Sequence, residues 1–354
     1  MKKLLVVLLV LLTSMIPCAA CSAQAEMMPI GQMSSSETWT EIMDTVNGPV
    51  QIDVTISLPD VTALPIYEVV YRDFTQDELK RVFPQAEIAI FDHNAMIAQG
   101  DFAAKVYPIA PDDCTWDEWP ADGDRAENAP DSKQDVENML QELWPGLYGG
   151  RQTSVWTRGM YAHSRTWRKG RLGELVEPVS EHGYYSCHLE LAVNDVTVYN
   201  DLFFERDRPG DVGPHAEDGM LDYYDADNYQ LLLSDLEIIR TIAEDAPLLP
   251  VEAIKYALGP LISTGHLREI YRIELCYVPM WSDARDSMIT VPAWVVHGEY
   301  HDLARAPSYD DTDDYYLRTF GGCPLVIPAQ TGKVIDYTDS SRERWLASTY
   351  LTEW

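Results

Sequence analysis

The segment VPAWVVHGEY, residues 291–300, has the composition of one buried strand and carries a proline at its second position. The segment YVPMW, residues 277–281, repeats the same V-P-x-W pattern. Because proline cannot donate a hydrogen bond to a β-ladder, each proline is expected at a sheet edge or at a bulge. The two segments therefore predict consecutive antiparallel strands, with Trp281 and Trp294 covering one end of a nearby helix.

The neighbouring segments extend this small sheet. The segment PVEAIKYALGPLIS before it predicts a helix from Pro250 to Ile262, which Gly259-Pro260 bends or ends. A longer helix, residues 227–246, is predicted just before that one. The remaining strands are expected at residues 267–277, 290–296 and 324–328, followed by a turn at 330–333. The C-terminal part is thus expected to be two helices followed by an antiparallel sheet.

The first half of the chain mixes strands and helices. Residues 50–58 (VQIDVTISL) alternate apolar and polar side chains, the period of a half-buried strand. Thr75 and Glu78 form a capping box that predicts a helix start, and Ser132 caps a second helix, 132–143. Further strands are predicted at residues 66–71, 154–161, 184–193 and 196–204, with a tight turn at Asn194-Asp195. This grouping, without strict β–α alternation, predicts an α+β fold with antiparallel sheets packed against helices.

The N-terminus has the layout of a secretory signal peptide, residues 1–25. Two lysines precede an apolar run of nine residues, Leu4 to Leu12, which is shorter than the roughly 20 residues that span a bilayer. Two alternatives remain open: cleavage before Glu26, or a lipobox in which Cys21 is lipidated. Both place the mature chain outside the cytoplasm, secreted or anchored to the membrane by lipid. Residues 26–45 are expected to be a flexible tether, followed by an N-terminal domain, 46–225, and a C-terminal domain, 226–345.

The chain is strongly acidic. Its net charge is −31, and the loss of Lys2 and Lys3 with residues 1–25 makes it −33. Nucleic acid is excluded as a partner, because phosphate binding needs a basic surface. Anionic headgroups would also repel the chain. Membrane contact is therefore expected only through the possible anchor at Cys21.

Four cysteines remain in the mature chain, namely Cys114, Cys187, Cys276 and Cys323. An even number in an oxidising compartment permits two disulfides in any of three connectivities. A bond between Cys276 and Cys323 is favoured, because both adjoin the C-terminal strands.

The sequence contains no recognisable catalytic, metal or cofactor motif. His297 and His301 are four apart, but the glutamate between them is misplaced for H-E-x-x-H and the stretch continues a strand. The acidic segments 222–227 and 310–314 lack the glycine and closing glutamate of an EF-hand and are interpreted as solvated loops. We therefore expect a protein that is not an enzyme and that carries neither metal nor cofactor.

One loop suggests a different function. Residues 108–131 are acidic and rich in proline, and within them Trp116 and Trp119 stand among Asp and Glu residues, as in sugar-binding surfaces. The alternative hypothesis is a secreted protein that binds or hydrolyses glycans with this loop.

The C-terminal third resembles a known module. The helix PVEAIKYALGPL, the strands YVPMW and VPAWVV and the final PLVIPAQTGKVIDY are similar to the C-terminal part of PepSY-like regulatory lipoproteins of Gram-positive bacteria. The whole layout resembles an uncharacterised family of exported lipoproteins from anaerobic Gram-positive bacteria. The resemblance covers about residues 245–340. It implies a helix with three or four strands and a regulatory or protein-interaction role at the cell envelope.

The N-terminus of the mature protein distinguishes the two cleavage alternatives. Mass spectrometry of the exported protein is expected to find either a diacylglyceryl group on Cys21 or a free N-terminal Glu26. A chain that still begins at Met1 would contradict export by either route.

Overall fold

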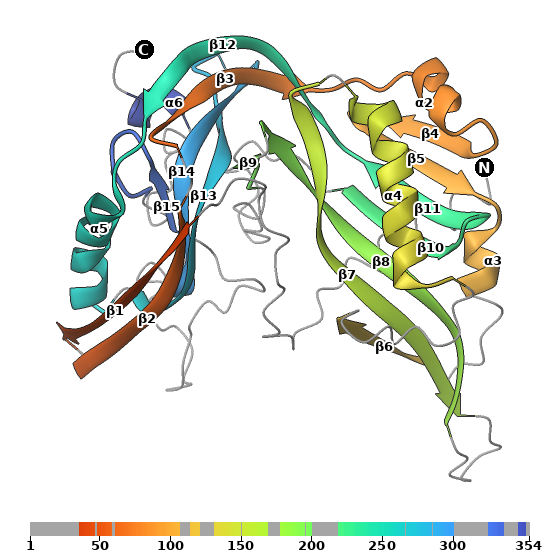
Figure 1. The fold of residues 1–354 in the computed structure, drawn as a ribbon, viewed down its shortest axis with the longest axis horizontal. Coiled ribbons are helices and arrows are strands. Elements are labelled where there is room, and N and C mark those ends of the chain that lie inside the picture. Colours follow the sequence, from red (N-terminus) through yellow and green to blue (C-terminus); the bar gives the residue numbers. More distant parts are fainter. Residues whose placement is uncertain are drawn as a thin grey trace, which may run out of the picture. The chain divides into compact units, whose positions relative to one another are not determined.

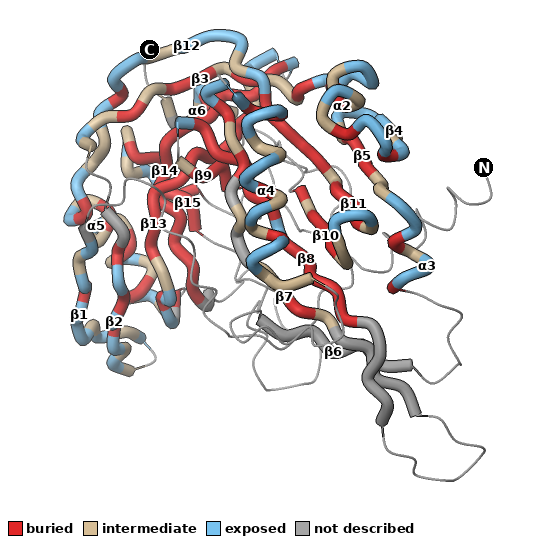
Figure 2. Tube along the Cα trace, turned by 45° about the vertical axis from the view of Figure 1, so that its right-hand side comes forward, coloured by how far each residue is buried: buried red, intermediate tan, exposed pale blue. Residues whose placement is uncertain are grey.

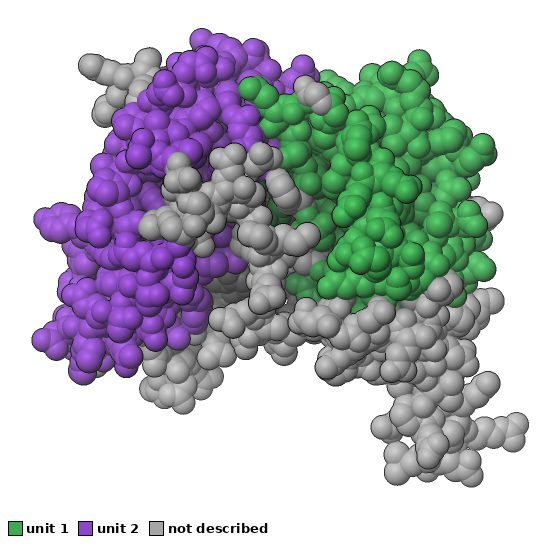
Figure 3. Space-filling model, viewed as in Figure 1, with its two compact units in different colours: residues 1–28, 72–191, 217–235 green, residues 29–71, 192–216, 236–354 purple. Residues whose placement is uncertain are grey.

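The computed structural model describes residues 35–46, 48–58, 61–106, 114–120, 131–149, 151–168, 178–194, 196–199, 219–265, 267–284, 286–300, 325–335 and 346–351. They form two compact units, shown in Figure 3. Unit 1 takes its described residues from 72–191 and 217–235, and unit 2 from 29–71, 192–216 and 236–354. The units therefore interleave along the chain, unlike the expected division into 46–225 and 226–345.

Unit 2 contains a seven-stranded sheet in the order β1-β2-β13-β14-β3-β12, with β15 also paired to β14 (Figure 1). Its elements are β1 (Ser35–Thr45), β2 (Gly48–Leu58), β3 (Ala63–Tyr71), β12 (Leu236–Pro247), α5 (Val251–Ser263), β13 (Leu267–Trp281), β14 (Met288–Tyr300), β15 (Leu325–Pro328) and α6 (Ala347–Tyr350). The predicted strands 267–277 and 290–296 are confirmed as parts of β13 and β14, and the described residues 325–328 of the predicted strand 324–328 form β15.

The two V-P-x-W segments do not lie at a sheet edge, so that prediction is wrong. Strands β13 and β14 are interior and pair with each other, with Tyr277 opposite Pro292 and Pro279 opposite Thr290. The carbonyl of Tyr277 accepts from the Tyr199 N–H, and that of Pro292 from the Ala329 N–H, each at 2.8 Å. Both carbonyls thus point away from the β13–β14 ladder.

Hydrogen-bonded and non-hydrogen-bonded pairs alternate along an antiparallel ladder. The pair Tyr277–Pro292 is of the second kind, and so is Pro279–Thr290, two residues along. The N–H that each proline lacks would point away from the partner strand. Moreover, Pro292 lies where β14 changes neighbour, from β3 at residues 288–290 to β15 at residues 293–296. Proline is tolerated here because no bond of the β13–β14 ladder is lost.

The sheet of unit 2 carries one apolar core on each face. Helix α5 packs Val251, Ile254, Leu258 and Ile262 onto a cluster that includes Trp294 of β14. Trp281 instead packs against the other cluster, with Val278, Met280 and Ala347. The prediction that the tryptophans cover the helix is thus confirmed for Trp294 and wrong for Trp281. Figure 2 shows that most of the described residues of β13, β14 and β15 are buried.

Helix α5 confirms the predicted helix 250–262 almost to the residue. Pro250 precedes its first turn, and Pro260 lies inside it without ending it, since the helix continues to Ser263. The hydroxyl of Thr264 donates to the Pro260 carbonyl at 2.7 Å, which satisfies part of the last turn.

The predicted helix 227–246 is wrong. These residues form β11 (Asn228–Leu233) and β12, separated by Ser234 and Asp235. The leucines and isoleucines lie at a helix-like spacing, but Ile238, Thr241 and Ile242 are β-branched and favour strands. Pairing with β5 and β10 on one side of the break, and with β3 on the other, decides the conformation.

The expected tether 26–45 is wrong for its second half. Residues 35–45 form β1, which pairs with β2 over its whole length. Trp39 is buried beneath α5, and its indole N–H donates to the Glu41 carboxylate at 2.9 Å. Residues 26–34, the predicted signal peptide 1–25 and Cys21 lie outside the described residues.

Unit 1 is built on a second sheet, in the order β4-β5-β11-β10-β8-β7-β6, and the short β9 pairs with the end of β8. Its elements are α2 (Gln76–Val82), β4 (Glu87–Phe91), β5 (Asn94–Gln99), α3 (Phe102–Val106), β6 (Cys114–Pro120), α4 (Lys133–Tyr148), β7 (Thr153–Arg168), β8 (Pro178–Val193), β10 (Gly219–Asp225) and β11. The last two residues of β8 and the strand β9 (Val196–Thr197) fall in the segment 192–216, which belongs to unit 2. With unit 2, this makes the fold broadly α+β, as predicted.

The N-caps predicted at Thr75 and Ser132 are confirmed. The Thr75 hydroxyl accepts from the Glu78 N–H before α2, and Ser132 and Asp135 form a reciprocal capping box before α4. Helix α4 runs five residues past the predicted end, through Pro145 to Tyr148. Asn194 adopts a left-handed backbone, φ 48°, in the predicted turn between β8 and β9.

The predicted loop 108–131 is wrong over residues 114–120, which form β6 and pair with β7. The acidic segment 222–227, expected to be a loop, instead ends β10 and turns into β11. None of the described helices combines the length and apolar sequence needed to cross a membrane.

The close approach of β13 to Gly298 gives a test of the central ladder. A Cβ added to Gly298 would lie 2.2 Å from the carbonyl oxygen of Glu269. Gly298→Ala is therefore expected to lower the free energy of unfolding by roughly 1–3 kcal/mol, the usual cost of overpacking, in urea titrations. Adding Glu269→Ala should not restore it, because the clash is with the main chain. Unchanged stability in Gly298→Ala would contradict the close contact between Gly298 and the Glu269 carbonyl.

Candidate functional site

Three clusters of buried polar side chains are the first candidates for a site. In unit 2, His297 of β14 contacts the carboxylate of Glu274 on β13, with 2.6 Å between Nε2 and Oε1. The Arg272 guanidinium lies 2.9 Å from the same oxygen, and the Tyr199 ring meets the imidazole edge-on. The spacing of His297 and His301 does not fit an H-E-x-x-H metal site, so both histidines are expected to be hydrogen-bonded within the protein or exposed to solvent. His297 is hydrogen-bonded, whereas His301 lies outside the described residues.

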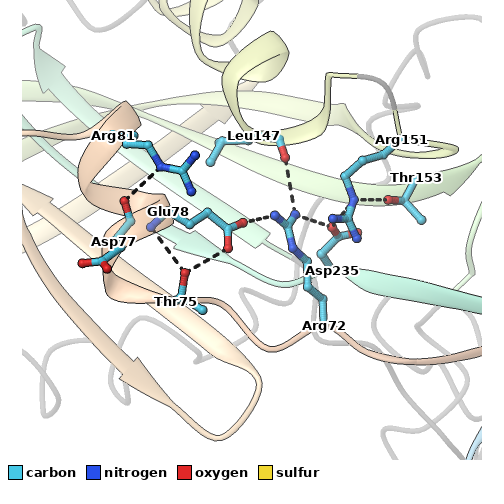
Figure 4. Close-up of polar contacts among 9 residues, drawn as sticks. All are labelled: Arg72, Thr75, Asp77, Glu78, Arg81, Leu147, Arg151, Thr153 and Asp235. Atoms are coloured by element: carbon cyan, nitrogen blue, oxygen red, sulfur yellow. Dashed lines mark hydrogen bonds and ion pairs between the residues drawn. The ribbon is translucent and has the colours of Figure 1, made fainter.

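A second cluster ties together the segments around α2 and α4 of unit 1 (Figure 4). The buried Arg72 guanidinium contacts Asp235 at 2.8 Å and pairs with Glu78 on its other side. Arg151 lies 3.7 Å from the same Asp235 carboxylate. Two cations and two carboxylates thus neutralise one another, so the cluster keeps no uncompensated charge that would attract a ligand.

Close by, the phenol of Tyr148 is buried and has no hydrogen-bond partner among the described residues. Burial raises its pKa well above the usual value, and the Asp235 carboxylate adds to this effect. Tyr148 therefore stays neutral and serves as packing.

The third cluster pairs a histidine with a serine on the sheet of unit 1. His163 Nε2 of β7 lies 2.6 Å from the Ser186 hydroxyl of β8, and its ring stacks on Tyr184 with centroids 4.4 Å apart. Burial, with a smaller effect from His188, lowers the pKa of His163 to about 4. A neutral imidazole beside a hydroxyl has the composition of a nucleophile–base pair. Ser186 is only 5% exposed, however, so the arrangement favours a structural hydrogen bond over attack on a substrate.

The residues predicted as site residues are not brought together. Trp116 and Trp119 both lie on β6, opposite Arg165 and Ala162 of β7. Being three apart on a strand, their positions fall on opposite faces of the sheet, which disfavours one stacking surface built from both. Cys276 is buried in β13, and Cys323 lies outside the described residues, so the Cys276–Cys323 disulfide stays a prediction.

The described residues also bear on Cys187 and on the acidic segments considered as metal sites. Cys187 is a buried free thiol whose pKa is raised, first by burial and then by Asp222, so it is unreactive. Within the described ranges, no group of three His, Cys, Asp or Glu side chains is arranged to hold a metal ion. The segment 310–314 lies outside them.

A surface feature that the sequence analysis missed is the free edge of β1. Pro49 lies opposite Asp44 in the β1–β2 hairpin and cannot donate, so this pair is not hydrogen-bonded. By alternation, Thr38, Thr40 and Ile42 are in the same class, and their N–H and C=O groups point away from β2. Among the described residues, no strand pairs with that side.

Two of the other edge strands, β12 and β4, are less suited to pairing. Strand β12, at the opposite edge of the same sheet, breaks register at three places and exposes charged residues such as Glu237 and Asp245. Bulges and charges are the usual protection of an edge. In unit 1, the edge strand β4 has only five residues. Strand β1 is 11 residues long and keeps a regular register throughout.

The exposed side of the β1–β2 hairpin is polar with one apolar residue at its centre. Ile42 is 71% exposed, and Thr38, Thr40 and Thr55 are exposed around it. The hairpin residues 35–58 include the acids Glu37, Glu41, Asp44 and Asp53 and no lysine or arginine. Only Glu37 has a basic partner among the described residues of the unit, Lys255 of α5.

The comparisons with known proteins add little. No protein-family model matches the chain, and no curated protein matches it. A solved structure, that of an uncharacterized protein from Eubacterium rectale ATCC 33656, is similar at 11% identity with a TM-score of 0.48. The match covers 80% of this chain and 90% of that one. It carries no conclusion about function.

The buried state of His163 predicts a pH dependence. Its pKa is about 4 in the folded chain and about 6.5 when unfolded, so between these values the unfolded state binds more protons. The stability that His163 contributes is present above pH 6.5 and falls as the pH drops towards 4. At pH 5 the loss relative to pH 7.5 is about 2 kcal/mol, measured by urea unfolding.

Two variants isolate this effect. His163→Gln removes the titrating group, so the loss between pH 7.5 and pH 5 should shrink by that amount. Ser186→Ala breaks the hydrogen bond but keeps the buried ring, so it should retain the wild-type pH dependence. The same pH dependence in wild type and His163→Gln would contradict the assignment.

Proposed function

We propose that this protein is exported to the cell envelope and acts there as a non-catalytic module that binds a protein partner. The export signal in residues 1–25 and the acidic, motif-poor sequence favour this role. The resemblance of residues 245–340 to PepSY-like regulatory lipoproteins agrees with it. A lipid anchor at Cys21, if that cleavage alternative is used, would hold the chain at the membrane.

The observation that carries the proposal is the free edge of β1. Its outward N–H and C=O groups come from Thr38, Thr40 and Ile42, on a regular strand whose other side is fixed by β2. An extended segment of a partner can add to such an edge through main-chain hydrogen bonds. The buried polar clusters, by contrast, are satisfied within each unit and offer no comparable surface.

The glycan hypothesis has less support. It relies on Trp116 and Trp119 acting together, and their positions lie on opposite faces of β6. Strand addition needs only a regular edge strand with outward N–H and C=O groups, which β1 provides.

A pair of substitutions at Thr38 tests strand addition. Thr38→Pro removes one outward N–H, whereas Thr38→Val changes the side chain and keeps that N–H. Neither removes a bond between β1 and β2, so both should fold, with stability within about 1 kcal/mol of wild type because proline is accepted at sheet edges. With a photo-crosslinking amino acid in place of Thr40, intact cells should yield one dominant cross-linked envelope protein in the wild type and in Thr38→Val. The cross-link should be lost in Thr38→Pro.

The outcome against the proposal is equally clear. Equal cross-linking in both Thr38 variants would mean that the main chain of β1 takes no part in binding. Circular dichroism melts of the two variants show that a lost cross-link does not reflect unfolding.

A further inference from the structure

The charge around β1 indicates which kind of segment it binds, an inference that rests on the proposed function. A strand added to β1 would place alternate side chains on the two faces of the sheet. On the open face its neighbours would be Thr40, Ile42 and Asp44. On the face of α5 they would include Glu41, whose carboxylate is exposed and held by the Trp39 indole.

Carboxylates therefore lie near Ile42 on both faces of the sheet: Glu41 on the face of α5, and Asp44 and Asp53 on the open face. Asp44 follows Ile42 on the same face, and Asp53 of β2 accepts a hydrogen bond from the Thr40 hydroxyl at 3.3 Å beside it. Opposite charges directly across two strands are favourable, and like charges are unfavourable. With a net charge of −31 on the whole chain, a second copy of this protein would be repelled.

We propose that β1 binds an extended, basic segment of another protein, with an apolar residue opposite Ile42 and Lys or Arg opposite Asp44 and Glu41. The apolar residue would cover the 71% of Ile42 that is exposed. A segment that pairs antiparallel to β1 meets Asp44 first and Glu41 last. From its N-terminus, its sequence is therefore a basic residue, any residue, an apolar residue and a basic residue. Because Thr38, Thr40, Ile42 and Asp44 have outward main-chain groups, the residues opposite them donate and accept the hydrogen bonds of the new ladder.

Synthetic peptides test this order. The probe is Thr-Lys-Thr-Val-Lys-Thr-Val-Thr, labelled with a fluorophore, and its binding to the purified protein is followed by fluorescence polarisation. Three relatives accompany it: one with glutamate for both lysines, one with threonine for both, and one N-methylated at the fourth and sixth residues. These N–H groups would face β1.

We expect the lysine peptide to bind at least tenfold more tightly than the glutamate peptide and to weaken as salt is raised. The threonine peptide should fall between them. The N-methylated peptide should lose at least tenfold in affinity. Asp44→Asn with Glu41→Gln should weaken binding of the lysine peptide severalfold and leave the threonine peptide unchanged.

A matched variant controls for net charge. Glu237→Gln with Asp245→Asn removes two exposed carboxylates from β12, at the other edge of the same sheet, and should leave lysine-peptide binding unchanged. Equal loss in this control would show that only the total charge matters, which would overturn the placement at β1.

The outcomes separate this inference from the proposed function. Equal binding of the lysine and glutamate peptides, with N-methylation still harmful, would overturn the basic partner and keep strand addition. Undiminished binding of the N-methylated peptide would overturn strand addition itself. Absence of binding by all four peptides would count against both.

Discussion

The pairing of β13 with β14 is the interaction on which unit 2 depends. The two strands stay in contact from Leu267 to Trp281, with two register shifts near the start. Each face of the ladder supports one core, with α5 on one side and the segment around Ala347 on the other. The remaining strands attach to this pair: β2 to β13, and β3 and β15 to β14. Pro279 and Pro292 can occupy this central position because the ladder uses neither of their missing N–H groups.

Local signals in the sequence were sufficient where the structure is decided locally. The caps at Thr75 and Ser132 and the helix after Pro250 follow from side-chain chemistry within a few residues. Segment 228–247 shows the limit of such signals, because its leucine and isoleucine spacing suits a helix while its pairing partners lie far away in sequence. The same limit explains why the packing of Trp281 was predicted wrongly. The cluster that it contacts depends on the register of β13 and on its position at the end of that strand.

The candidate surface was harder to predict than the fold. Residues 35–45 are mostly small or polar and follow the predicted signal peptide, which suggested a tether. Their side chains nevertheless show a strand period, with Trp39 and Met43 on one side and Thr38, Thr40 and Ile42 on the other. What makes β1 available is its place at the end of the sheet order, and that place depends on the assembly of the whole unit. The buried pairs Glu274–His297 and His163–Ser186 join residues 23 apart, so no local motif could reveal them.

The interleaved order of the segments also governs when the protein can fold. Strand β2 pairs with β13 through Ile56 and Ile273, and β14 needs β15 near residue 328 before its ladder is complete. Contacts of such long sequence separation form late, since the loop between them must first be closed. Because synthesis proceeds from the N-terminus, β1 and β2 would therefore be made long before their sheet can form. Folding of unit 2 would have to await synthesis of nearly the whole chain, which gives chaperones a wide interval in which to act.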